Sequence, residues 1–139
     1  ASSMARPMLK FMLDTNIVIY TMKNRPEQVR RRFNKHGEQL CISSVTYGEL
    51  VYGCERSAWP EKNLKNLESF VSRLELLSFD ANAASHFGEL RAKLHAAGKP
   101  IGPYDMMIAG HARSRGLILV TNNLKEFERV DGLRLENWL

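Results

Sequence analysis

Short apolar runs recur along the chain and are separated by longer amphipathic stretches. Runs of about four to eight apolar residues that are bounded by turn residues are typical of buried β-strands. We therefore predict strands at residues 9–13, 39–43, 76–79, 117–120 and 133–136.

The stretches between these strands carry apolar residues at helical spacing. They predict helices at residues 17–20, 27–34, 46–55, 60–74, 81–97 and 103–115. Gly98 and Gly116 supply the left-handed residues that commonly end a helix. Thr46 and Glu49 have the spacing of a capping box, so we expect Thr46 to cap the third helix.

Strands that alternate with helices predict the α/β class. Each helix would join two strands by a right-handed crossover, which gives a mainly parallel sheet covered on both faces. The 139 residues, 44% of them hydrophobic, suffice for one core, so we expect one domain at residues 8–139. Residues 1–7 match neither a signal peptide nor a folded element, and we interpret them as a cloning remnant before Met8.

The chain is basic, with a formal net charge of +5 and an isoelectric point of about 9.4. Such a charge favours an anionic partner, because Lys and Arg gain affinity by neutralising phosphates. No apolar stretch approaches the roughly 18 residues that a membrane span requires, so we expect a cytoplasmic protein without a membrane segment. Cys41 and Cys54 lack the spacing of a zinc or redox motif and are expected to be buried, reduced thiols.

Three acids are expected at one edge of the sheet. Asp14 directly follows the first strand, and Glu49 lies early in the helix after the second. Asp105 begins the helix that leads to residues 117–120, and such a helix starts at the carboxyl edge of a parallel sheet. Carboxylates within about 6 Å raise one another's pKa unless a cation neutralises them. We therefore predict a Mg²⁺ site, with Mn²⁺ as a substitute, that activates water against a phosphodiester.

Each acid also has a purely structural interpretation. Asp14 would cap the next helix, Glu49 would complete the capping box, and Asp105 would interact favourably with a helix dipole. For any single acid the two interpretations are evenly balanced. The joint position of all three at one sheet edge favours the metal site.

Four motifs of the chain occur in a specific order. They are Asp14-Thr15-Asn16, the segment from Ser43 to Leu50, Pro103-Tyr104-Asp105 with Ile108-Ala109, and Thr121-Asn122-Asn123 with Glu126-Phe127. Each is weak alone, but the set resembles the motifs of PIN domains, and the chain resembles the VapC toxins of bacterial toxin–antitoxin pairs from Met8 onward. The resemblance implies a three-layer α/β/α sandwich, a metal-dependent endoribonuclease, and Asp14, Glu49 and Asp105 as catalytic, metal-binding residues.

The fourth acid of many PIN nucleases is replaced here by an amide, Asn123. Asn123 can still hold a metal-bound water, and Glu126 would supply the missing charge. The number of metal ions that the site binds, one or two, stays open. Thr121 is expected to orient the acids through its hydroxyl group. Asn16 is the remaining supporting residue that we predict.

The resemblance also implies partners. Proteins of this kind cut structured RNA, and those most similar to this chain act on tRNA, with the anticodon region of initiator tRNA favoured. A homodimer is implied, together with a VapB-like antitoxin whose basic or aromatic tail blocks the acidic groove. Residues 50–52 and 64–74 are candidate antitoxin contacts. For RNA contacts we predict four basic residues: Arg113, Arg115, Arg30 and Arg31.

Two other functions stay open. Asp14 occupies the position of the nucleophile in doubly wound phosphatases, but those enzymes need a second Asp where this chain has Asn16. A non-catalytic module that binds RNA or a regulatory partner would use its acids only as helix caps. The four histidines show no ligand spacing and receive no role, and Trp59 and Trp138 are expected to close the core.

Overall fold

A five-stranded parallel sheet forms the centre of the molecule. The computed structural model describes residues 8–139, so the interpretation of residues 1–7 lies outside the described residues. The strands are β1 (Phe11–Leu13), β2 (Leu40–Ser43), β3 (Glu75–Leu77), β4 (Ile118–Val120) and β5 (Arg134–Glu136). Their order across the sheet is β3-β2-β1-β4-β5, and every neighbouring pair is parallel.

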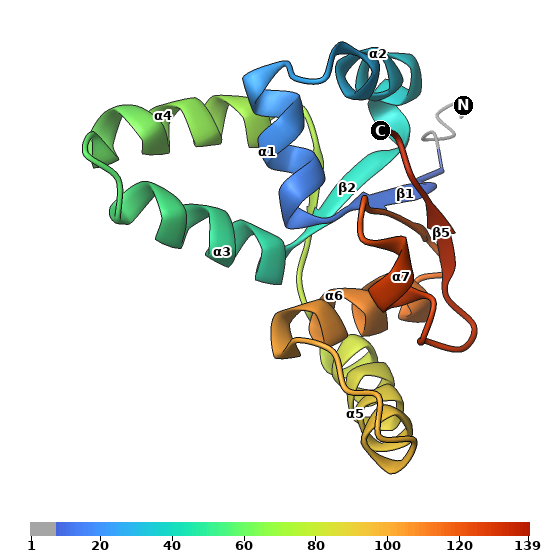
Figure 1. The fold of residues 1–139 in the computed structure, drawn as a ribbon. Helices are drawn as coiled ribbons and strands as arrows, with labels where there is room; N and C mark the ends of the chain where they lie inside the picture. Colours follow the sequence, from blue (N-terminus) through green and yellow to red (C-terminus); the bar gives the residue numbers. More distant parts are fainter. Residues whose placement is uncertain (1–7) are drawn as a thin grey trace, which may run out of the picture.

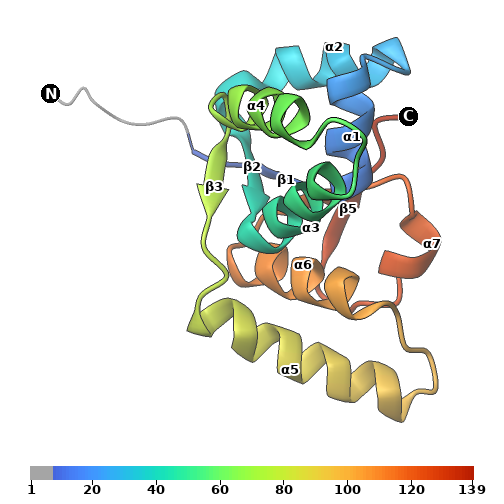
Figure 2. The same ribbon diagram turned by 90° about the vertical axis from the view of Figure 1, so that its left-hand side faces the viewer.

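Helices cover both faces of this sheet. They are α1 (Thr15–Lys23), α2 (Glu27–His36), α3 (Ser44–Glu55), α4 (Pro60–Val71), α5 (Ala81–Ala96), α6 (Pro103–Ser114) and α7 (Leu124–Phe127), and a 3-10 turn η1 (Gly37–Gln39) precedes β2. In Figures 1 and 2, α5 and α6 lie on one side of the sheet and α1 to α4 lie on the other. This arrangement confirms the predicted three-layer α/β/α sandwich with a parallel central sheet.

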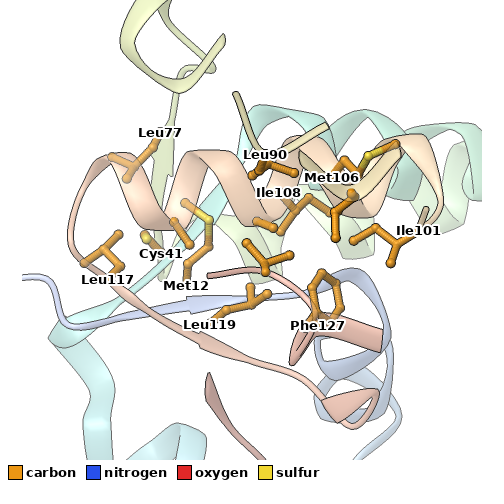
Figure 3. Packing of buried hydrophobic residues seen from close by; sticks show 14 residues of the cluster. Met12, Cys41, Leu77, Leu90, Ile101, Met106, Ile108, Leu117, Leu119 and Phe127 are labelled. Atoms are coloured by element: carbon orange, nitrogen blue, oxygen red, sulfur yellow. The ribbon is translucent and has the colours of Figure 1, made fainter. Parts of the chain in front are cut away.

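The alternation of side chains along the strands divides the core into two halves. Met12 on β1 and Leu119 on β4 face the layer of α5 and α6, and Figure 3 shows them on the same side as Ile108 of α6. Phe11 and Leu13, the neighbours of Met12, belong to the opposite half. Because these strands are buried on both faces, their sequences are continuous apolar runs, which made them predictable.

The third helix begins earlier than predicted. Ser43 is the N-cap of α3, and its Oγ accepts a hydrogen bond from the N–H of Val45 at 3.1 Å. Thr46 is buried inside the first turn, and its Oγ1 has no hydrogen-bond partner within residues 8–139. The predicted capping box is therefore wrong, because the serine at the end of β2 caps the helix first. Glu49 is left free for contacts outside its own helix.

The two tryptophans differ in their surroundings. Trp138 is 2% exposed and packs against Phe11 with ring centroids 5.5 Å apart, so its predicted role in closing the core is confirmed. Trp59 is 72% exposed, and the prediction for it is wrong. It precedes Pro60 in the connection between α3 and α4, which Figure 1 shows at the outer edge of the molecule.

Both cysteines are free thiols. Cys41 is buried on β2, and burial raises the pKa of its thiol to about 12, which makes it an inert core residue. Cys54 is only partly buried, because it faces the groove between α1, α3 and α4. Within the described part of the chain, no helix combines the length and apolar character that crossing a membrane demands.

Candidate active site

Polar side chains from four separate segments meet at the carboxyl edge of the sheet. Asp14 follows β1, the central strand, and Thr121 follows β4, its neighbour. Glu49 lies on α3, which begins at the end of β2 on the other side of β1. Asp105 lies in the first turn of α6, and Glu126 lies on α7, just after β4. Parallel strands bring these positions to the same edge although they are spread over most of the chain.

Asp14 is held on two sides. It is 6% exposed and caps α1, since its Oδ1 accepts a hydrogen bond from the N–H of Ile17 at 2.9 Å. Burial raises the pKa of Asp14, and the charge of Glu49 adds to this rise, whereas hydrogen bonds from the Thr121 hydroxyl and the Ile17 N–H oppose it. The net rise in pKa shows that the fold orients this carboxylate without fully stabilising its charge.

Glu49 is positioned by a residue that the sequence analysis missed. Its Oε1 accepts a hydrogen bond from the Oγ1 of Thr15 at 2.7 Å. Thr15 is the first residue of α1 and directly follows Asp14, so one turn of chain fixes both acids. The only signal for this role in the sequence is its adjacency to Asp14, because 34 positions separate Thr15 from Glu49.

Asp105 and Glu126 form a pair that shares a proton. Partial burial, a hydrogen bond to Glu126 and the charges of Glu126, Asp14 and Glu49 raise the pKa of Asp105 to about 7. Burial also raises the pKa of Glu126, but hydrogen bonds from Asp105 and Asn123 outweigh it and lower that pKa. Asp105 is therefore the member of the pair that carries the proton.

Asn123 orients Glu126 rather than replacing it. The Asn123 side-chain amide donates to Oε2 of Glu126, and the N–H of Gly102 lies 3.4 Å from Oε1. The backbone N–H of Asn123 donates to Oγ1 of Thr121 at 2.9 Å, so the turn after β4 connects both ends of the site. Asn16 is exposed in the first turn of α1, and its backbone N–H lowers the pKa of Asp14.

The donor set fits a hard divalent cation in its chemistry. Within residues 8–139, no three Asp, Glu, His or Cys side chains lie close enough together in this conformation to hold an ion. Each acid is instead hydrogen-bonded elsewhere: Asp14 to the start of α1, Glu49 to Thr15, and Asp105 to Glu126. All the available donors are carboxylate oxygens, which Mg²⁺ and Mn²⁺ prefer.

A family model supplies the decisive comparison, since the model described as PIN domain matches residues 11–133. The chain belongs to the PIN domain family. All five polar residues of the site, Asp14, Glu49, Asp105, Thr121 and Glu126, fall inside the matched region.

Close relatives of this PIN domain carry VapC names. The sequence is 63% identical over 131 residues to the tRNA(fMet)-specific endonuclease VapC of Shigella flexneri, covering 94% of this chain and 99% of the relative. It is 54% identical over 132 residues to ribonuclease VapC2 of Haemophilus influenzae, and the alignment covers 95% of this chain and 100% of the relative. A chain in the crystal structure of DNA-bound VapBC from Salmonella typhimurium matches with a TM-score of 0.91 and 59% identity. The match covers 95% of this chain and 100% of that chain. The predicted resemblance to VapC proteins is confirmed.

The four arginines predicted to bind RNA are spread over the PIN domain and do not gather at the acids. Arg113 and Arg115 are at the C-terminal end of α6, about 12 Å and about 15 Å along the helix axis from Asp105 at its start. Arg113 donates to Glu89, His86 and the carbonyl oxygen of Asp131.

On the opposite layer, Arg30 lies over the ring of Phe33 on α2, with its Nη1 3.4 Å from the carbonyl oxygen of Thr21. Arg31 is exposed beside Arg32. Arg30 and Arg113 thus have structural contacts within the fold, whereas Arg31 and Arg115 are exposed to solvent.

Proposed function

We propose that this PIN domain is a metal-dependent endoribonuclease and acts as the toxin of a toxin–antitoxin pair. The observation that carries the proposal is the gathering of Asp14, Glu49, Asp105 and Glu126 at one sheet edge. Burial first, and then the hydrogen bond to Glu126 and the negative charges of its neighbours, raise the pKa of Asp105 to about 7 there. Relatives named ribonuclease or endonuclease VapC, which align over almost the whole chain, support the same conclusion.

The proposed ion is Mg²⁺, for which Mn²⁺ can substitute, and its ligands are Asp14, Asp105 and Glu49. A divalent ion in such a site supplies an activated water and offsets negative charge on a phosphodiester. The protein contributes orientation. Thr121 and the start of α1 hold Asp14, and Thr15 holds Glu49, so these two carboxylates are fixed before substrate arrives.

Asp105 and Glu126 form the carboxyl pair of the site that can exchange a proton. A carboxyl group with a pKa near neutrality can release or accept a proton at little cost in the pH range of the cell. In the structure Asp105 is the member of the pair that carries this proton, and it donates a hydrogen bond to Glu126. Asp105 would have to be deprotonated to act as a ligand of a cation, and Glu126, held by Asn123, would be the neighbouring acceptor for its proton. We therefore assign Glu126 a supporting role.

We propose a tRNA substrate, with initiator tRNA as the first candidate. Two relatives, from Shigella flexneri at 63% identity and Salmonella typhimurium at 60%, are named tRNA(fMet)-specific endonuclease VapC. The net charge of +5 agrees with a polyanionic substrate. The position of the cut in the anticodon region stays a prediction from the resemblance.

We also propose a VapB-like antitoxin, because the matching solved structures include VapBC complexes at 59% and 39% identity. A groove of about 410 Å³ between α1, α3 and α4 suits such a partner. Its wall includes Ile19, Met22, Leu50 and Leu67, and at one end it reaches Glu49. An antitoxin segment in this groove would have its tail next to the acids. The homodimer and the cytoplasmic location stay predictions.

The test is cleavage of initiator tRNA by the purified protein, with new ends mapped. We expect cleavage with Mg²⁺ or Mn²⁺, none with a chelator, and a loss of several orders of magnitude in Asp14→Asn and Asp105→Asn. Glu126→Gln should lose less. The matched control is Asp80→Asn, because Asp80 caps α5, is exposed, and can be replaced by another good capping residue. A folded protein that binds RNA but never cuts it would be a binding module, which contradicts the proposal.

A further inference from the structure

A basic hollow lies next to the acidic site but is not part of it. It has a volume of about 420 Å³ and is formed by α5, the end of α6 and the chain after α7. Its cationic side chains are Lys93, Lys99, Arg113, Lys125 and Arg129. Two acids, Glu128 and Asp131, also line it, so positive charge predominates.

Not all of these cations are available to a ligand. Lys93 and Arg113 both pair with Glu89, at 2.8 Å and 2.5 Å. Lys99, Lys125 and Arg129 form no salt bridge with any other side chain within residues 8–139. We call these three residues the basic track.

The basic track is continuous with the acids. A second hollow of about 400 Å³, lined by Gly102, Asn123 and Glu126, shares Lys125 and Arg129 with the first. Lys125 is the neighbour of Glu126 on α7, and the charge of Arg129 lowers the pKa of Glu126. The track therefore starts beside the proposed site of cleavage and leads away from it.

The walls of the track are fixed by the fold. Nη1 of Arg129 donates to the carbonyl oxygen of Pro100 at 3.1 Å, and this contact fastens the loop between α5 and α6 to the chain after α7. Figure 2 shows α7 and that loop on the same side of the molecule. Lys99, at the start of the loop, and Lys125, on α7, are both exposed.

We infer that the basic track binds the phosphodiester backbone of the RNA strand on one side of the cleaved bond. This inference rests on the proposed ribonuclease function. Exposed Lys and Arg side chains that form no salt bridge are suited to binding phosphate oxygens along a hollow, and they contact RNA without reading its sequence. One end of the track lies beside Glu126, so a strand held along the cations would place one of its phosphodiester bonds next to the acidic site.

The experiment compares two double variants in an Asp105→Asn background, where RNA is bound but not cut. Lys99→Gln/Lys125→Gln removes two charges from the track, and neither lysine forms a salt bridge with another of the described residues. The control, Lys62→Gln/Lys65→Gln, removes two lysines that are also exposed, from α4 in the opposite layer. The probes are labelled single-stranded RNAs of increasing length, extended at either the 5′ or the 3′ end.

We expect the track variant to lose about tenfold or more in RNA affinity near 0.1 M salt, and the slope of log K against log salt to fall by about 1.4 for two lost phosphate contacts. In the parent, extending the RNA at one of its two ends should increase the affinity. In the track variant the same extension should have no effect. The control should behave as the parent does.

Equal losses in the track variant and the control, or no loss in either, would overturn the inference. A loss of affinity for the antitoxin with unchanged affinity for RNA would assign the track to the protein partner and would also overturn it. Failure of the parent to cut any RNA would instead count against the proposed function.

Discussion

At the scale of single residues, Asp14 combines the helix cap of the structural interpretation with a place in the proposed metal site. One oxygen of its carboxylate caps α1 through the N–H of Ile17, and the same group stands in the acidic site. Capping needs only a hydrogen-bond acceptor, which an amide also offers. Metal binding needs the negative charge. Substitutions can therefore separate the two tasks.

Asp14→Asn should keep the cap, and Asp14→Ala should lose it. We expect the alanine variant to lower the free energy of unfolding by about 1 kcal/mol, and the asparagine variant to stay within about 0.5 kcal/mol of the parent or above it. Relief of repulsion with Glu49 adds to the stability of both variants. The measurement is urea unfolding with a chelator present. Equal destabilisation by both would mean that the charge itself stabilises the metal-free fold.

Residue identity predicted some of the site but not its contacts. Asp14, Glu49 and Asp105 could be selected because each has a defined position relative to a strand. The hydrogen bond from Thr15 to Glu49 and the pairing of Asp105 with Glu126 could not be predicted, since both join distant segments. Side-chain contacts of this kind depend on the relative placement of helices, which local sequence does not encode.

At the scale of elements, α5 and α6 pack so closely that one position of α6, Gly110, has no room for a side chain. A Cβ built on Gly110 of α6 would lie 2.7 Å from the backbone nitrogen and 2.9 Å from the Cα of Phe87 on α5. Backbone atoms cannot move aside as a flexible side chain can. The first turn of α6 carries Asp105, so this packing also positions the acidic site.

Gly110→Ala should therefore push the two helices apart and lower the free energy of unfolding by about 1–3 kcal/mol. The matched control is Gly88→Ala on α5, where a Cβ meets nothing within 4 Å. That variant should gain about 0.5–1 kcal/mol, because alanine favours a helix over glycine. Denaturant unfolding of both variants is the measurement. A neutral result for Gly110→Ala would show that the α5–α6 contact adapts and does not fix the position of α6.

The limits of local sequence are visible in two elements. The start of α3 was misplaced because Ser43 and Thr46 are both good capping residues, and only the end of β2 decides between them. The helix α7 was missed because its four residues are too few to show periodicity. The buried strands and the long amphipathic helices were predictable because their patterns extend over whole elements.

At the scale of the whole molecule, parallel connections explain how the site is built. Each crossover returns the chain to the amino edge, so every strand ends at the same carboxyl edge. That rule made the common position of the acids predictable from the order of strands and helices. It does not predict how closely the carboxylates approach, and in the structure Asp14, Glu49 and Asp105 are each hydrogen-bonded to another group of the protein.

The most direct test of the account is a calorimetric titration of the metal-free protein with Mn²⁺ at neutral pH. We expect the parent and Asp80→Asn to bind the ion alike, and Asp105→Asn to bind it at least about tenfold more weakly, because one carboxylate ligand is lost. Binding by the parent should release protons, since Asp105 has a pKa of about 7 and must lose its proton to bind. Equal Mn²⁺ affinity in the parent and Asp105→Asn, or no binding by the parent, would contradict the account.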